Sequence, residues 1–239
     1  MYGLDAFGSH NDFRHWLRSA GYPEKYAPDG SGPGWDDDSV VEAFFRQVVE
    51  LGDRVTPPFA YTLDYVANEA YNSAYSKGET AMKLIWSNLV EPIRDTLGTD
   101  SLMTIPPGQG THRAMFVRPS LFFSVAASSQ RSSLAGRFLT FFLGDVEANR
   151  ILAAERGVPV VPAVREALQQ ESSRQVQVIF EYVDFVAHHS SPGPTAIPVN
   201  IGVLREVFEE TTRLVAFHHL TPAEGAVRLR QEWTALMSR

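Results

Sequence analysis

The sequence contains no cysteine, and this absence excludes several kinds of chemistry at once. Without thiols there is no disulfide, no thiolate-bound metal and no cysteine nucleophile. Lysine is scarce as well, since only Lys25, Lys77 and Lys83 stand among the 21 basic residues. The net charge is −7, and no run of Lys and Arg offers a basic patch for the phosphates of a nucleic acid. We therefore expect no nucleic acid among the partners.

Long apolar runs and catalytic signatures are missing too. No stretch approaches the roughly 20 apolar residues of a membrane helix. The first 13 residues lack the basic and apolar regions of a signal peptide. There is no GxSxG elbow, no P-loop and no Rossmann fingerprint. The pairs His188/His189 and His218/His219 are adjacent, so on a helix they diverge by about 100° and do not form an HExxH site. We expect no resident cofactor or metal.

Most of the chain has the pattern of helices. Ser9 is a good N-cap ahead of an aromatic helical face, and Asp36–Asp38 place carboxylates at the start of the next helix. The last helix has the clearest start, because Thr221 and Glu224 match a capping box and Pro222 stands at the first helical position. Helices are predicted over residues 10–20, 38–52, 88–97, 132–144, 145–157, 162–170, 173–188, 202–217 and 222–237.

Three short apolar stretches have the pattern of strands. They are Ala81–Trp86, Ser101–Ile105 and Met115–Ala127, the last with a break at Pro119. Since these strands are few and separated by helices, they predict an α/β fold and not an all-helical bundle.

Six segments, taken in order, resemble the conserved stretches of a known family. They are SKGETAM, LMTIPPGQG, FSVAASSQ, LAGRFLTFFLGDVEANRIL, ERGVPVVPAVREAL and LTPAEGAVRLRQEW. In the same order they are similar to GkaAM, mapLPgGpgG, laIsatSk, eaAwkFlkfltspeaq, ktGglParkdal and ltpeeAldeaqkei. These belong to the sugar-binding family of ABC-transporter solute-binding proteins, which is maltose-binding-protein-like.

The resemblance implies a receptor without enzymatic activity outside the cytoplasm, periplasmic or anchored at the cell surface. In that family two lobes close around a sugar or oligosaccharide by a hinge motion and pass it to a membrane permease. The order of the segments implies that residues 1–239 form mainly the C-terminal lobe of a type II periplasmic-binding-protein fold, with returning hinge and helical segments. It implies a few-stranded sheet flanked by many helices, with the N-terminal lobe and its secretion signal absent. The implied partners are a carbohydrate, the permease subunits of an ABC importer and the missing lobe.

The strongest candidates for ligand contact lie in two apolar stretches of the sequence. Trp86 ends a predicted strand and offers an indole face to a sugar ring, although the same residue type often belongs to a core. Arg118, beside Phe116, stands within an apolar stretch, where a guanidinium needs a carboxylate partner or a ligand rich in hydroxyls. Pro119 and Ser120 replace a glycine pair of the family, which changes the local backbone and adds Ser120 to the candidates.

Five further residues are weaker candidates, each with a structural alternative. The resemblance places His10 and Asn11 at a helix start that faces the cleft, where capping is the alternative role. Trp35 follows a Gly-rich loop and either lines the cleft or packs on the next helix. His112 follows the PPGQG loop, where exposure to solvent is the alternative, and Asn200 precedes a helix that faces the cleft in the family, where capping is the alternative.

Two other functions stay open at this point. The fold could serve as a ligand-free interaction domain whose helical half binds a partner, which predicts no response to sugars and an exposed apolar face. A hydrolase using carboxylates is the third possibility, although no acidic pair in the sequence is placed to act as one.

Overall fold

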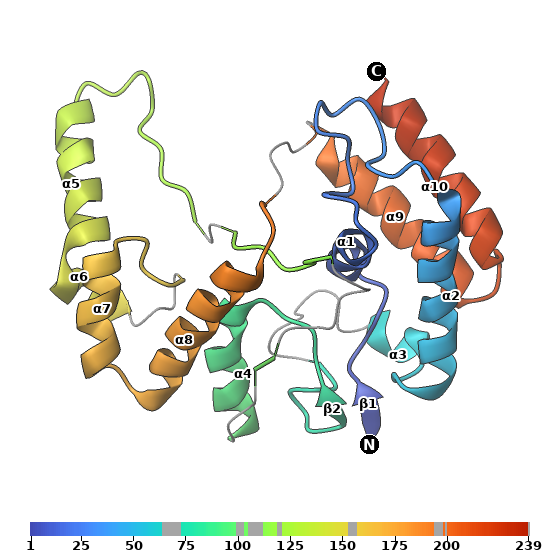
Figure 1. Cartoon of the computed structure of the whole chain (residues 1–239), viewed down its shortest axis with the longest axis horizontal. Coiled ribbons are helices and arrows are strands. Elements are labelled where there is room, and N and C mark those ends of the chain that lie inside the picture. Colours follow the sequence, from blue (N-terminus) through green and yellow to red (C-terminus); the bar gives the residue numbers. More distant parts are fainter. Residues whose placement is uncertain are drawn as a thin grey trace.

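The computed structural model describes residues 1–63, 73–98, 103–104, 112–118, 121–152, 157–193, 198 and 200–238. Two helical halves are joined by extended segments, and both termini lie in the first half (Figure 1). The helices of the first half are α1 (His10–Ser19), α2 (Asp38–Arg54), α3 (Phe59–Leu63), α9 (Ile201–Ala216) and α10 (Pro222–Met237). Those of the second half are α5 (Ser132–Gly144), α6 (Val146–Leu152), α7 (Pro162–Glu171) and α8 (Arg174–His189). Between them lie η2 (Ser87–Leu89) and α4 (Val90–Leu97).

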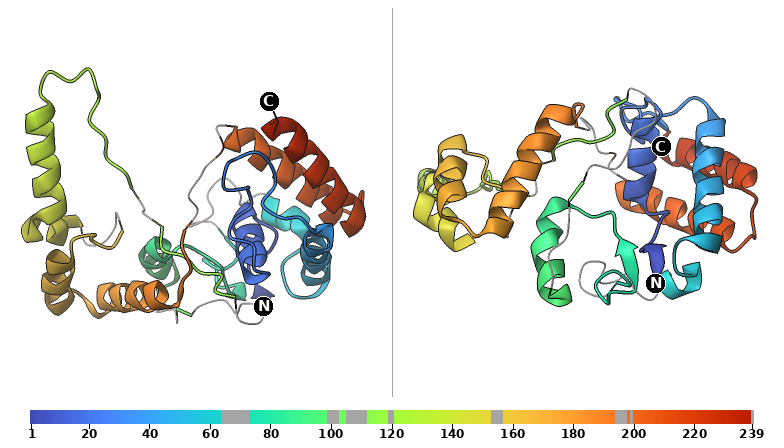
Figure 2. Two further views of the ribbon diagram at one scale, coloured as in Figure 1. Left: turned by 45° about the horizontal axis from the view of Figure 1, so that its top comes forward. Right: turned by 60° about the horizontal axis from the view of Figure 1, so that its bottom comes forward.

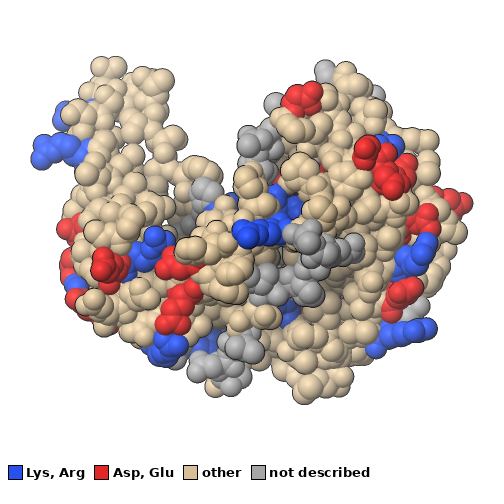
Figure 3. Space-filling view, viewed as in Figure 1, with Lys and Arg blue, Asp and Glu red and all other residues tan. Residues whose placement is uncertain are grey.

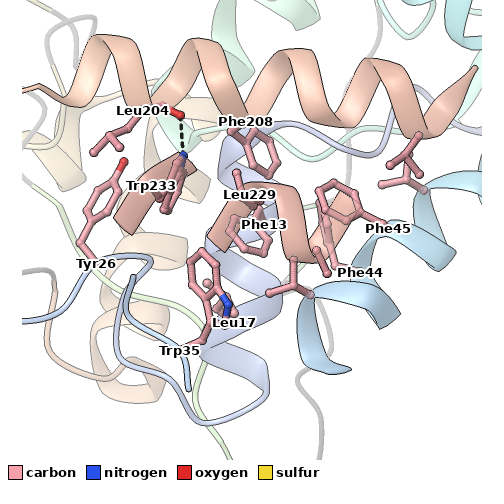
Figure 4. Close-up of a cluster of buried hydrophobic side chains, with 14 residues drawn as sticks. Phe13, Leu17, Tyr26, Trp35, Phe44, Phe45, Leu204, Phe208, Leu229 and Trp233 are labelled. Carbon is pink, nitrogen blue, oxygen red and sulfur yellow. Dashed lines mark hydrogen bonds between the residues drawn. The ribbon is translucent and has the colours of Figure 1, made fainter. Parts of the chain in front are cut away.

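An aromatic core holds the first half together. Phe13 of α1 is completely buried, and its ring lies 5.0 Å from that of Phe44 on α2 and 5.0 Å from that of Phe208 on α9. Trp233 of α10 closes the cluster, and its Nε1 donates to the Leu204 carbonyl at 2.9 Å (Figure 4). Each of these rings buries a large apolar area, so the cluster fixes the position of α1.

The predicted helix starts are confirmed where the sequence encodes a cap. Ser9 Oγ accepts from the Asp12 N–H at 3.2 Å, and Asp12 Oδ2 accepts from the Ser9 N–H at 2.8 Å. Asp37 caps α2, which continues beyond the predicted end at Gly52 to Arg54. A single glycine costs a helix about 1 kcal/mol, too little to end one that is packed along its length.

The start of α10 gives a first test of this capping. Replacing Thr221 by alanine removes the oxygen that accepts from the Glu224 N–H at 3.3 Å. We expect the free energy of unfolding to fall by about 1 kcal/mol, as for other N-cap substitutions. Denaturation by urea measures this. A Thr221→Ser variant keeps the hydroxyl and should stay within about 0.5 kcal/mol of the unchanged protein; equal losses in both variants would contradict the capping role.

The sheet is small, as predicted, and its two strands lie at opposite ends of the N-terminal third. Strand β1 (Tyr2–Leu4) pairs in parallel with β2 (Thr80–Met82), with Tyr2 opposite Thr80. The strand predicted over 81–86 therefore starts one residue earlier and pairs only as far as Met82. The helix predicted over 88–97 begins as the 3₁₀ turn η2 and continues as α4. Most of the predicted strand 101–105 and its following loop lie outside the described residues.

The prediction of a buried strand over Met115–Ala127 is wrong. Residues 112–118 and 121–126 are not part of a β-strand in the described part of the chain, and Phe122 is 84% exposed. An apolar strand is buried only when other strands and helices cover it. Those partners are not supplied by the described residues.

Two extended segments, 112–118 and 190–193, run side by side between the halves. The Ser191 N–H donates to the Met115 carbonyl at 3.0 Å. Arg18 of α1 ties both segments to the first half, because its Nε donates to a carbonyl of the first at 2.8 Å and its Nη2 to a carbonyl of the second at 2.9 Å. Both connections between the halves are thus fastened to one side chain.

The second half has a modest core and a large uncovered surface. Its core lies between α7 and α8 and consists of Val164, Leu168, Val176 and Phe180. In contrast, α5 stands away from the first half (Figure 2) and exposes Leu134, Phe138 and Phe141. We call these three residues the apolar face of α5. Among the described helices, none is both long and apolar enough to cross a bilayer.

Candidate ligand-binding site

A cavity of about 710 Å³ lies beside the start of α1. Its walls come from the first turn of α1, the end of α2, residues 83–86 after β2, residues 114–116 and one side of α9. Its volume lies within the range of about 300–1,000 Å³ that small-ligand sites occupy. Four of the residues predicted from the sequence line it, namely His10, Asn11, Trp86 and Phe116.

Two aromatic rings form one corner of this cavity. Trp86 and Phe116 meet edge to face, with ring centroids 6.0 Å apart and planes at 84°. Guanidinium groups lie against both rings: Arg118 is 5.2 Å from the centroid of Trp86, and Arg14 and Arg18 are 5.6 and 4.8 Å from that of Phe116. The structure therefore brings together Trp86, Phe116 and Arg118, which the sequence offered as separate candidates for ligand contact.

His10 and Asn11 face the cavity from the first turn of α1. Because Ser9 caps this helix, the Asn11 side chain is not used for capping, and its buried Oδ1 has no hydrogen-bond partner among the described residues. Burial lowers the pKa of His10 to about 3, and the positive charges of Lys25, Arg205 and further arginines act in the same direction. His10 is therefore neutral at physiological pH and can exchange hydrogen bonds with a ligand.

The other candidates do not line this cavity. Trp35 is 3% exposed and belongs to the aromatic core, with its ring 5.5 Å from Phe13, so its position is that of a packing residue. The Asn200 side chain donates to the Leu236 carbonyl at 2.9 Å and links α9 to α10. His112 lines a second, smaller cavity of about 330 Å³. Ser120 lies outside the described residues.

Sequence reasoning missed a buried cluster of charges behind the aromatic corner. Arg14 stands one helical turn after His10, and its Nε donates to Glu24 at 2.9 Å in a buried ion pair. Its spacing of four residues from His10 was a usable signal, since such residues share a helix face. Lys25 is 2% exposed, and burial lowers the pKa of its ammonium to about 7. Nothing in the sequence marks Lys25, because its burial depends on packing against α1.

Comparison with known proteins addresses the fold. No protein-family model matches the chain. A solved structure described as extracellular solute-binding protein family 1, from Alicyclobacillus acidocaldarius, superimposes with a TM-score of 0.84 at 22% identity over 100% of this chain. The chain has the fold of extracellular solute-binding proteins. The resemblance stated from the six segments is confirmed in this respect.

Other solute-binding protein structures agree with this fold. A periplasmic oligogalacturonide-binding protein from Yersinia enterocolitica, in complex with saturated digalacturonic acid, has a TM-score of 0.76 at 16% identity. A maltose/maltodextrin-binding domain from Bdellovibrio bacteriovorus, bound to maltotriose, has a TM-score of 0.65 at 13% identity. A de novo designed cysteine esterase also shares the fold. The chain spans only 60–61% of the length of the solute-binding proteins named.

Proposed function

We propose that this chain is part of a solute-binding protein that binds a carbohydrate in the cavity beside Trp86. The observation that carries the proposal is the corner formed by Trp86 and Phe116 at the cavity wall. One face of a sugar ring is apolar and can lie on an indole, while its hydroxyls need polar partners such as His10 and Asn11. The structures bound to digalacturonic acid and maltotriose support a carbohydrate ligand.

Several acidic side chains around the cavity are already engaged, which supports binding over acid–base catalysis. Asp5 forms a buried ion pair with Lys83 at 2.6 Å. Asp12 accepts hydrogen bonds at the start of α1, and Glu209 pairs with Arg205 at 2.6 Å. A general acid or base needs a carboxyl group that can reach the reacting atoms. We therefore propose a protein without enzymatic activity.

The proposal extends to the parts that this chain does not contain. The structurally similar binding proteins are longer, and the apolar face of α5 is uncovered. We propose that a second lobe packs on this face and that the ligand is held between the two lobes. The complete receptor would act outside the cytoplasm and deliver its sugar to the permease of an ABC importer. Closure would follow the hinge motion of two-lobed receptors.

The test is an NMR titration of the 239-residue chain, read at the indole N–H signals. The panel contains maltooligosaccharides, xylooligosaccharides and monosaccharides. We expect weak binding that shifts the Trp86 signal, since contacts from a second lobe are missing. Trp86→Ala should weaken binding at least about tenfold, because removing a central aromatic anchor costs about 2 kcal/mol or more. Trp86→Phe keeps a ring and should retain most of the affinity.

Phe122→Ala is the matched control, because Phe122 is an exposed ring that does not line the cavity. It should bind as the unchanged chain does. Binding that survives Trp86→Ala would rule out this site. Absence of any response across the panel would favour the alternative of a ligand-free interaction domain, whose expected exposed apolar face the structure also has.

A further inference from the structure

We propose that the ligand is an acidic carbohydrate, whose carboxylate is bound by Arg14 and Arg118 while its ring lies on Trp86. This inference rests on the proposed function, because it uses the same cavity. It adds the charge of the ligand, which the aromatic corner alone does not determine.

Arg118 is the first of the two residues proposed to bind the carboxylate. Its guanidinium carbon lies 5.2 Å from the centroid of the Trp86 ring, which holds the planar group in place. In the described part of the chain, no carboxylate lies within ion-pair distance of Arg118, and its side chain is exposed. Arg118 itself is not among the residues that line the cavity, but it lies against the ring of Trp86, which does, so its donors are open to a ligand that reaches this ring.

Arg14 is the second residue proposed to bind the carboxylate, and it is more buried than Arg118. The residue is 8% exposed and lines the cavity, and its Nε is occupied by Glu24. The two terminal nitrogens of Arg14 have no hydrogen-bond partner among the residues that the structure describes. A guanidinium with one side fixed by a protein carboxylate and the other side free is oriented to bind a second carboxylate through two parallel hydrogen bonds.

Basic groups near the aromatic corner, and not the lining of the cavity as a whole, favour an anion, because the lining holds five acidic and four basic side chains. Pairing accounts for Arg14 with Glu24 and for Arg205 with Glu209, but Lys25 has no carboxylate within ion-pair distance in the described ranges. Among the residues that the structure describes, the Lys25 ammonium contacts the His10 carbonyl at 3.4 Å and the Tyr26 ring at 5.4 Å. Although the chain carries a net charge of −7, basic atoms are seen in the hollow at the middle of the molecule, and both flanks carry acidic and basic atoms together (Figure 3).

A carboxylate on the ligand would offset the cost of burying a positive charge in the site. A buried or partly buried cation without a partner carries a desolvation penalty, and an incoming carboxylate relieves it. A neutral sugar supplies hydroxyl dipoles but no charge, so it leaves the free side of the buried Arg14 guanidinium without an anionic partner. The cavity should therefore discriminate between two sugars that differ only in a carboxylate.

The test compares matched pairs of sugars on the intact 239-residue chain. Galactose and galacturonate, glucose and glucuronate, and the corresponding disaccharides are titrated at low and at high salt. We expect the acid of each pair to bind roughly tenfold or more tightly at low salt, as for a charge-assisted pair. This advantage should shrink as salt screens the charges.

Substitutions assign the discrimination to residues. Arg118→Gln should reduce the preference for the acid roughly tenfold and change the affinity for the neutral sugar little. Arg118→Lys keeps the charge and should retain part of the preference. Arg14→Gln should act like Arg118→Gln, and circular dichroism shows whether it still folds. Arg131→Gln makes the same charge change at the start of α5, outside the cavity, and should have no effect.

The outcomes separate this inference from the proposed function. Equal affinity for acid and neutral sugar would overturn the inference and leave the sugar site standing. Acetate, phosphate or sulfate binding as tightly as the sugar acid would overturn it too, because the site would then recognise an anion without a sugar. No binding by any sugar, neutral or acidic, would refute the proposed function itself.

Discussion

Replacing Phe13 by alanine is expected to lower the free energy of unfolding of the first half by about 3–5 kcal/mol, the usual cost of deleting a buried phenylalanine ring. The ring is 0% exposed and contacts Phe44, Phe208 and Trp233 on three other helices. Water cannot enter to replace the contacts that the ring loses, and a cavity would remain in the middle of the core. The loss should be measured by guanidinium denaturation followed by tryptophan fluorescence, because Trp35 and Trp233 lie in this core.

Phe122→Ala is the control for the same chemical change at an exposed site. Since Phe122 is 84% exposed, its removal should alter the unfolding free energy by no more than about 0.5 kcal/mol. A loss below about 1 kcal/mol for Phe13→Ala would contradict the aromatic core. The substitution should also weaken ligand binding, because α1 carries His10, Asn11 and Arg14 to the cavity.

Raising the pH from 7 toward 10 is expected to stabilise the first half through Lys25. The folded-state pKa of this ammonium is lowered from 10.5 to about 7, mainly by burial, with Arg14 acting in the same direction and Glu24 against it. Between these two pKa values the unfolded chain binds a proton that the folded chain does not. The free energy of unfolding therefore rises with pH, by up to about 1.4 kcal/mol per pH unit from this group. Below pH 7 both states are protonated and the full penalty remains.

Lys25→Met removes the titrating group while keeping an apolar side chain of similar length. We expect the variant to be more stable at pH 7 and to lose the rise toward pH 10, as measured by urea denaturation across the range. Tyr26 does not mask the effect, since burial raises its pKa to about 12. Lys77→Met is the matched control, because Lys77 is exposed, and it should keep the rise. An unchanged pH dependence in Lys25→Met would show that another group is responsible.

Features encoded locally were predictable from the sequence. The capping boxes at Ser9 and Thr221 start α1 and α10 at the expected residues, because a cap needs only side chains within one turn. The strand predicted over Met115–Ala127 failed for the opposite reason. Its apolar residues were read correctly as needing burial, but burial depends on partners that the sequence pattern of this segment cannot supply.

The candidate site was predictable in part for the same reason. Trp86 and Arg118 stood out because each residue type was unusual for its apolar surroundings. In the structure the guanidinium carbon of Arg118 lies 5.2 Å from the centroid of the Trp86 ring. Trp35 was a weaker candidate with core packing as its alternative, and it lies in the core, since an aromatic residue after a loop fits either place. Lys25 and Glu24 gave no signal at all. Their burial results from how the loop after α1 folds back on that helix.

Under the proposed function, the position of Arg18 bears on how a movement of the second half would reach the ligand. Both segments that join the halves are hydrogen-bonded to this one side chain, so a rotation of the second half would pivot close to it. Arg14 stands one helical turn away, about 6 Å along α1. Groups so near a pivot are displaced little, whereas the far end of α5 sweeps a wide arc. The contacts of Arg14 with a ligand would therefore change little with the hinge angle. The contacts that favour the closed receptor over the open one would have to come from groups farther from the axis.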